Sequence, residues 1–158
     1  MNRLLLQLIA LLEIVGGIWG LSIMLYRMAN VLDNFKFLLF LLIYLVPFIT
    51  SIIAGILLFK KKTAGLNLSL VIQLLQIPYF ALAGLYYSFI SGVLAGIRIS
   101  FLKGMTHYNF NFLFGGYCQI QTGLPGEISA FGINIFAGVM FSFLLLNKLQ
   151  GKEVRNYK

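Results

Sequence analysis

The sequence predicts a membrane all-α four-helix bundle with a small extracytoplasmic antiparallel β-meander between its third and fourth helices. Sixty per cent of the 158 residues are hydrophobic and 10% are charged, whereas a soluble domain averages about 45–50% apolar and about 25% charged residues. The mean hydropathy is +0.94, and so few charges cannot cover the surface of a soluble protein. Residues 1–158 are therefore interpreted as one integral membrane domain.

Four stretches are candidates for membrane helices, which need about 20 apolar residues to cross about 30 Å of hydrocarbon. The expected spans are residues 4–26, 37–59, 64–90 and 128–147. No A-x-A cleavage motif follows the first of them, so we expect it to be retained and not removed as a signal peptide.

Lysine and arginine residues predict the orientation, because cytoplasmic loops are enriched in them. With four spans and the N-terminus inside, eight cations fall on one side of the membrane and four on the other. The larger group comprises Arg3, Lys60, Lys61, Lys62, Lys148, Lys152, Arg155 and Lys158. The smaller group comprises Arg27, Lys36, Arg98 and Lys103. This bias predicts a multi-pass protein with both termini in the cytoplasm.

Glu13 is the residue that most needs an explanation, because it lies about 13.5 Å inside the first span at about 1.5 Å per residue. A charged side chain at such a depth is costly and normally faces the interior of a bundle. Similar counting on the other spans predicts an intramembrane polar cluster of Glu13, Thr50, Gln73, Gln76 and Asn134. Gln73 is the first candidate for a hydrogen bond to Glu13.

Three roles for this cluster stay open. The favoured role is hydrogen-bonded packing between helices. The second is transport or proton relay, which is weakened because the expected spans hold no further acid or base. The third is an acid that meets a cation from another chain.

Small residues on the same helix faces predict close helix packing. Gly16 and Gly20 form a GxxxG pair on the face that carries Glu13. The expected packing residues are Gly16, Gly17, Gly20, Gly55 and Gly138.

The connection before the fourth span is predicted to form strands at residues 96–102, 107–114 and 117–122, because apolar and polar residues alternate there. Gly115-Gly116 lies between two of these runs and is a hairpin signal. Glu127 is expected in the first turn of the helix that follows. The aromatic residues expected to form a partner surface are Tyr108, Phe110, Phe112, Phe114 and Tyr117.

Several alternatives are open for this outer segment. The sheet could lie as a lid on its own helices, on lipid headgroups or on a partner. A re-entrant or interfacial aromatic segment is the alternative to a sheet.

The sequence contains no recognisable motif for cofactor, metal or nucleic-acid binding. Cys118 is the single cysteine and His107 the single histidine, so a thiol pair is excluded and a metal site is poorly supported. The sequence therefore favours a non-enzymatic protein over an enzyme.

Residues 11–18 (LLEIVGGI), 54–58 (AGILL) and 73–78 (QLLQIP) together resemble small four-span bacterial membrane proteins. The resemblance covers the whole chain. It implies the bacterial inner membrane and assigns no activity.

The expected function is that of an accessory or assembly subunit that binds through its outer β segment. The alternative is a small transporter or channel that uses the polar layer around Glu13. The expected partners are the lipid bilayer and either another membrane protein or a second copy of the chain, with no nucleic acid and no cofactor.

Overall fold

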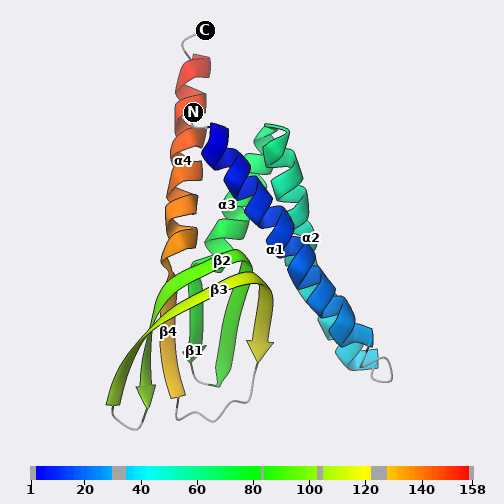
Figure 1. The fold of residues 1–158 in the computed structure, drawn as a ribbon, viewed down its shortest axis with the longest axis vertical. Helices are drawn as coiled ribbons and strands as arrows, with labels where there is room; N and C mark the ends of the chain where they lie inside the picture. The colour runs from blue at the N-terminus through cyan, green and yellow to red at the C-terminus, as the bar shows by residue number, and fades with distance from the viewer. Residues whose placement is uncertain (1–2, 30–34, 83, 103–104, 122–127, 157–158) are drawn as a thin grey trace.

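The described part of the chain forms four helices and a four-stranded antiparallel sheet. The computed structural model describes residues 3–29, 35–82, 84–102, 105–121 and 128–156. In chain order the elements are α1 (Arg3–Ala29), α2 (Phe35–Phe59), α3 (Thr63–Gln76), β1 (Pro78–Leu82), β2 (Leu85–Leu102), β3 (Met105–Gln121), β4 (Ile128–Asn134) and α4 (Ile135–Asn156). Helices make up one end of the molecule, and the sheet makes up the other (Figure 1).

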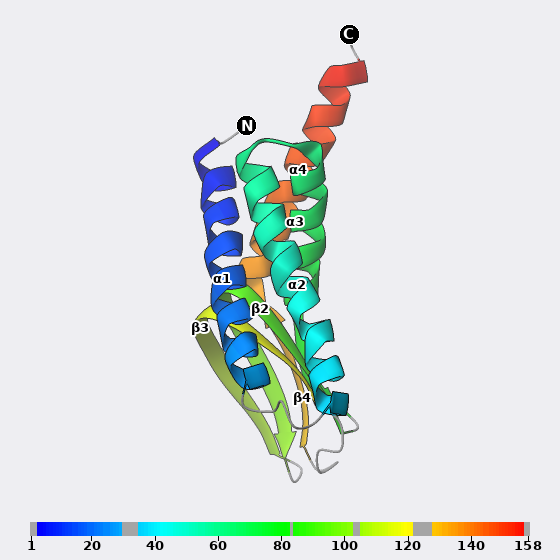
Figure 2. The ribbon, with the colours of Figure 1, turned by 90° about the vertical axis from the view of Figure 1, so that its right-hand side faces the viewer.

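Two helices are long and apolar enough to cross a membrane, namely α1 and the Leu42–Phe59 part of α2. They pack side by side and continue from the helical end to the level of the sheet (Figure 2). α3 and residues Ile135–Gln150 of α4 are apolar but shorter. The predicted all-α bundle with four spans is therefore wrong, because among the described residues two of the four expected spans are partly strand.

The predicted third span, residues 64–90, is divided between a helix and two strands. α3 ends at Gln76, and Pro78 begins β1. Proline lacks the N–H of a helical hydrogen bond and clashes with the preceding turn. The residues after Pro78 are rich in aromatic side chains, which favour strands. Hydrophobicity could not reveal this change, because a continuous apolar run fits a buried strand as well as a helix.

The predicted fourth span, residues 128–147, begins as strand β4 and becomes helix α4 at Ile135. Asn134 is the last residue of the strand and comes directly before the helix. Its Oδ1 accepts a hydrogen bond from the backbone N–H of Ala137 at 3.3 Å, which is the contact that an N-cap side chain makes. The predicted helical position of Glu127 lies outside the described residues.

The strands pair in the order β1-β4-β2-β3, with a further pairing between β1 and β2. The start of β2 pairs with β1, with Tyr87 opposite Phe80, and its end pairs with β4, with Ile97 opposite Ile133. Because β1 and β4 also pair with each other, these three strands close on themselves. β3 pairs with β2 along its length, and no described strand covers its other edge.

Residues 96–102 and 107–114 are strands as predicted and pair with each other within β2 and β3. The three-stranded meander is wrong, because residues 105–121 form one continuous strand with no hairpin at Gly115-Gly116. Gly115 has a φ of 131° and lies opposite Gly92, whose φ is 120°. Positive φ values of this kind suit glycine, and here they fall at the same point of two paired strands. The two strands therefore bend together into an arch (Figure 1).

The top of this arch presses against α1. A Cβ atom on Gly16 would meet the backbone of Ser91 and Gly92, and one on Gly116 would meet the backbone of Gly16 and Gly20. Gly16 therefore allows a close contact between a helix and strands. A Cβ atom on Gly20 would meet the ring of Phe48, so Gly20 also allows the contact between helices that a GxxxG motif usually indicates.

Three apolar clusters form the core of the part of the chain that the structure describes. The first lies where α1, α2 and α3 meet the sheet and contains Met24, Tyr44, Phe48, Ala54, Ile72, Phe89 and Cys118. The second joins the four helices and contains Leu6, Ile9, Ala10, Leu58, Leu70, Met140 and Leu144. The third lies within the sheet and contains Tyr79, Ile90 and Leu94.

Polar side chains are buried in this protein, while large apolar side chains are exposed on the helices and the strands. The buried polar residues are Glu13, Ser51, Ser69, Gln73, Gln76, Ser88, Ser91, Asn134 and Asn147. Exposed apolar residues on α2 include Ile43, Val46, Ile49 and Ile53, and those on β3 include Phe110, Phe112 and Phe114. Buried polar groups and large exposed apolar areas are the two features that depart from an ordinary soluble domain.

We expect Gly16→Ala to lower the free energy of unfolding by about 1–3 kcal/mol, the usual cost of overpacking. Its Cβ atom would meet backbone atoms of the arch, which cannot rotate away. Gly138→Ala is the matched control, because nothing lies within 4 Å of its added Cβ atom. Thermal unfolding in mild detergent should show a lower melting temperature for Gly16→Ala alone, and equal behaviour of the two variants would contradict the close contact.

Candidate functional site

Glu13 lies in the middle of a buried polar network. Its side chain is 0% exposed and lies where α1 packs against α2 and the bent strands. Ser69 Oγ donates to Glu13 Oε2 at 2.7 Å, and Gln73 Nε2 donates to Glu13 Oε1 at 3.0 Å. Both donors come from α3, one turn apart, so they reach the two carboxyl oxygens from the same helix face. The expected contact between Glu13 and Gln73 is thus present.

A pair of serines joins Glu13 to the top of the arch. Ser51 of α2 donates from Oγ to the backbone carbonyl of Glu13 at 3.0 Å, and its Oγ lies 2.7 Å from Ser91 Oγ. A hydroxyl group has one hydrogen to donate, so with this arrangement Ser91 donates to Ser51. The network therefore connects α1, α2 and β2 through side chains that sequence reasoning did not select.

Gln76 lies at the end of α3 and binds the backbone of the arch. Its Oε1 accepts a hydrogen bond from the N–H of Ser91 at 2.9 Å. Its Nε2 has no hydrogen-bond partner among the described residues. Gln76 also lines, with Gln73 and Ser91, a void of about 10 Å³, which is close to the space that one water molecule needs.

Asn134 binds the other side of the arch. Its Oδ1 accepts from the N–H of Ala95 at 3.2 Å, and its Nδ2 donates to the carbonyl of Val93 at 3.0 Å. The same Oδ1 caps α4 through Ala137. Gln76 and Asn134 thus supply hydrogen bonds to the part of β2 that lies between its pairings with β1 and β4.

Thr50 is not part of this network. Its Oγ1 donates to the carbonyl of Val46 in its own helix at 2.8 Å, and its side chain lines a cleft on another side of α2. Ser51, the next residue, occupies the position expected for Thr50. A helix turns about 100° per residue. A prediction that is off by one residue along the helix therefore places the wrong side chain on the buried face.

The glycines expected to pack are placed as follows. A Cβ atom on Gly17 would meet Ile52 and Phe48 of α2, and one on Gly55 would meet Ala10 and Ile14 of α1, so these two glycines allow α1 and α2 to approach closely. Gly138 lies beside open space and allows no such contact.

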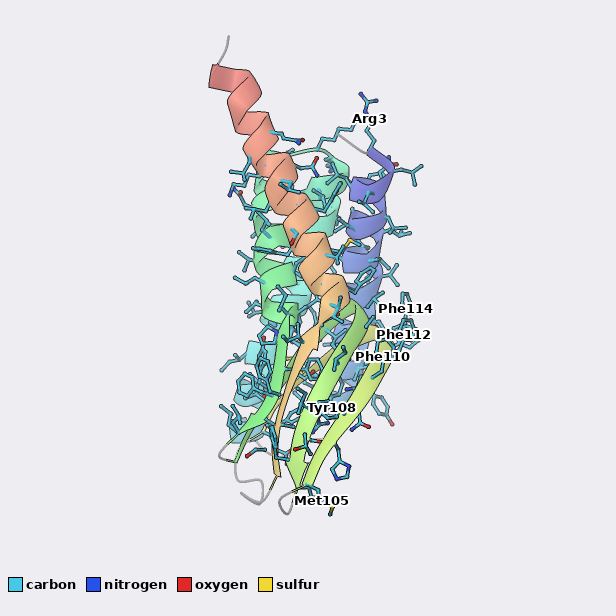
Figure 3. All side chains as sticks on the ribbon, turned by 90° about the vertical axis from the view of Figure 1, so that its left-hand side faces the viewer. Arg3, Met105, Tyr108, Phe110, Phe112 and Phe114 are labelled. Carbon is cyan, nitrogen blue, oxygen red and sulfur yellow. The ribbon has the colours of Figure 1, made fainter. Side chains whose placement is uncertain are left out.

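The aromatic residues of β3 divide into two groups. Tyr108, Phe110, Phe112 and Phe114 are 51–72% exposed and project outward along the strand with the uncovered edge (Figure 3). Tyr117 is half-buried and packs on the cluster of Tyr79, Ile90 and Leu94 inside the sheet. It lies beyond the bend at Gly115, so it does not belong to the outward group.

A cleft of about 550 Å³ with an apolar lining opens between α2, α3 and the bent strands. Cys118 and Tyr87 are among its lining residues. Cys118 is buried, and a buried cysteine in apolar surroundings is chemically inert.

Catalytic or metal chemistry finds little support in the described residues. They contain no group of three or more histidine, cysteine, aspartate or glutamate side chains that could hold a metal ion. His107 lies on the exposed part of β3, opposite Ser100. The buried carboxyl group of Glu13 is paired with neutral donors. What the arrangement can do is hold strands and helices together.

No family model, curated protein or solved structure matches this chain. These comparisons therefore do not support the resemblance to small bacterial membrane proteins, and the four spans that the resemblance implies are contradicted by the fold.

We expect Glu13→Leu to destabilise the protein and Glu13→Gln to preserve most of its stability. Leucine leaves the buried donors of Ser69 and Gln73 unpaired, which costs about 1–3 kcal/mol for each group. Glutamine keeps an oxygen acceptor and adds an amide that can donate to Ser69 Oγ. Thermal unfolding in mild detergent would measure the difference, and equal melting temperatures for the two variants would show that these hydrogen bonds add no stability.

Proposed function

We propose that this chain is a non-enzymatic protein of the bacterial inner membrane that acts by binding another protein through strand β3. It crosses the bilayer with α1 and α2, and it serves as an accessory or assembly subunit. The partner supplies a β-strand that pairs with the uncovered edge of β3.

Membrane insertion is supported by the distribution of polar and apolar side chains. Two helices have the length and hydropathy of a membrane span, and the outward faces of all four helices carry large apolar residues. The polar side chains of the same region are hydrogen-bonded in the interior, where intramembrane polar residues are normally found.

The uncovered edge of β3 is the observation that carries the binding proposal. The arch meets α1 at Gly16, about 20 Å along the helix from Arg3 at about 1.5 Å per residue. With a hydrocarbon layer of about 30 Å, the bend of β3 lies at membrane depth. Gly115 and Gly116 at the bend are buried against α1, so the uncovered edge is that of the neighbouring residues of β3. Open sheet edges do not face lipid, because their backbone groups would lack hydrogen bonds. A strand from a partner would supply those bonds.

The exposed aromatic residues support the same surface. Phe110 and Phe112 are each 69% exposed, and they follow the uncovered edge (Figure 3). Aromatic side chains are enriched at protein interfaces, where they supply a large apolar contact area.

A transport function is less well supported. It requires a water-accessible cavity that reaches the polar layer, whereas the void described beside Gln73 and Gln76 is about 10 Å³. The larger cleft is lined mainly by apolar side chains. The polar network is thus better suited to holding helices and strands together than to conducting a solute.

The orientation follows from where the cations lie. Both termini and the turn between α2 and α3 are at the helical end of the molecule (Figure 1). Arg3 and Lys60–Lys62 are therefore at one end, and Arg27 is at the far end of α1. The positive-inside rule then favours a cytoplasmic helical end and a sheet that extends outward.

We expect a cysteine at position 61 to resist a membrane-impermeant maleimide in intact cells. Lys61→Cys lies at the proposed cytoplasmic end, while Thr106→Cys on exposed β3 should react from outside. Both variants should be made with Cys118 replaced by serine, and labelling after permeabilisation gives the total. External labelling of position 61 would contradict the orientation.

We expect Phe110→Ser combined with Phe112→Ser to abolish the proposed complex without unfolding the chain. Both side chains are largely exposed, so their loss removes contact area and leaves the core intact. The measurement is affinity purification in a gentle detergent, followed by determination of the mass of the complex.

The control is Phe59→Ser, which removes an aromatic side chain that is 53% exposed at the helical end. A complex with another protein, or a defined homo-oligomer, that survives Phe59→Ser and is lost in the double variant would support the proposal. A monomer of the unsubstituted chain, or a complex unaffected by the double substitution, would refute it.

A further inference from the structure

The cleft of about 550 Å³ opens between two helices and the bent strands. Val46 and Pro47 of α2 and Val71 and Leu75 of α3 form two sides, and Cys118 of β3 belongs to the third. Its volume is within the range of about 300–1,000 Å³ that is usual for ligand sites. The cleft is open at one side, because Ile43 and Val46 in its lining are largely exposed, so a ligand can enter it from outside the molecule.

The walls of the cleft present almost only carbon atoms, because its hydroxyl groups donate elsewhere. Tyr44 Oη donates to the carbonyl of Ile120 at 2.7 Å, and Tyr87 Oη donates to the carbonyl of Leu75 at 2.8 Å. Thr50 donates within its own helix. Among the described residues, none that lines the cleft is charged. An occupant that fits this lining is a hydrocarbon, since a polar group would lose its hydrogen bonds to water.

The position of the cleft indicates where the hydrocarbon comes from. The α2 residues that line it, from Ile43 to Thr50, lie about 13 to 24 Å along the helix from Phe59 at about 1.5 Å per residue. This places them inside a hydrocarbon layer of about 30 Å. Ile43 and Val46 are 66% and 60% exposed, so the cleft is continuous with the outward apolar face of α2.

We propose that the cleft binds one acyl chain of a bilayer phospholipid. The inference rests on the membrane placement proposed above. The chain enters sideways from the lipid between α2 and α3 and lies against the bent strands. The bound chain fills the cleft, and no polar headgroup contact is required of the lining residues.

The first test measures the phospholipid that stays with the chain. The full chain is purified from nanodiscs of defined phosphatidylglycerol and phosphatidylethanolamine, exchanged into mild detergent and analysed by native mass spectrometry. We expect one phospholipid to remain on the unsubstituted chain. Val46→Trp combined with Val71→Trp should lose it, because the two indole rings occupy the cleft.

The matched control is Val139→Trp on α4. Val139 is 57% exposed and does not line the cleft, so this variant should retain the lipid. Equal retention in the two variants would show that the lipid lies elsewhere on the surface. Complete loss from the unsubstituted chain would show that the cleft holds no chain tightly. Either result would overturn the proposal.

A second test uses the unsubstituted chain and so does not depend on the folding of a variant. Nanodiscs containing a phospholipid with a diazirine at the end of one acyl chain are irradiated, and the adducts are mapped by peptide mass spectrometry. We expect adducts to concentrate on residues 43–50, 71–75 and 118–120. An even distribution over α1, α2 and α4 would overturn the proposal.

The two proposals can fail separately. A chain that alkaline carbonate extracts from membranes would refute the membrane placement, and the cleft proposal with it. A chain that stays in the membrane but shows an even distribution of adducts would refute the cleft proposal alone.

Discussion

The bend in β2 creates a need for hydrogen bonds that no neighbouring strand can meet. Between its pairings with β1 and β4, the backbone of β2 is bound by side chains, with Gln76 on Ser91 and Asn134 on Val93 and Ala95. Each buried backbone group left without a partner would cost about 1–3 kcal/mol. Gln76 ends α3, and Asn134 comes directly before α4. The two side chains that bind the arch therefore lie where one helix ends and another begins.

The contact with α1 depends on the same bend. Gly16 and Gly116 let the backbones of the helix and the strands approach closely, and Glu13, almost one turn from Gly16, is bound by Ser69 and Gln73. Side-chain hydrogen bonds and close backbone packing thus act at one level of the molecule. At that level the interior is polar, while the outward faces of the helices are apolar. A bilayer would accommodate this arrangement, because lipid contacts the apolar outward faces while the polar side chains bind one another in the interior.

The same reasoning separates the two surface features. The cleft beside α2 is lined by side chains whose hydroxyl groups already have partners, so its lining suits a hydrocarbon chain. The edge of β3 exposes backbone N–H and C=O groups, which a hydrocarbon cannot bind. One feature is therefore suited to lipid and the other to a protein strand, although both are bordered by apolar side chains.

The sequence by itself determined that polar groups are scarce, that Glu13 has to be buried, and that Gln73 is a candidate for a hydrogen bond to it. These conclusions depend on composition and on helical spacing, which are local properties. Only the tertiary structure decided that residues after Pro78 form strands, that Gly115 bends a strand opposite Gly92, and that Ser51 occupies the place expected for Thr50. The physical reason is that a continuous apolar run has no periodicity to distinguish a helix from a strand. The choice then rests on pairing with strands that are distant in the sequence.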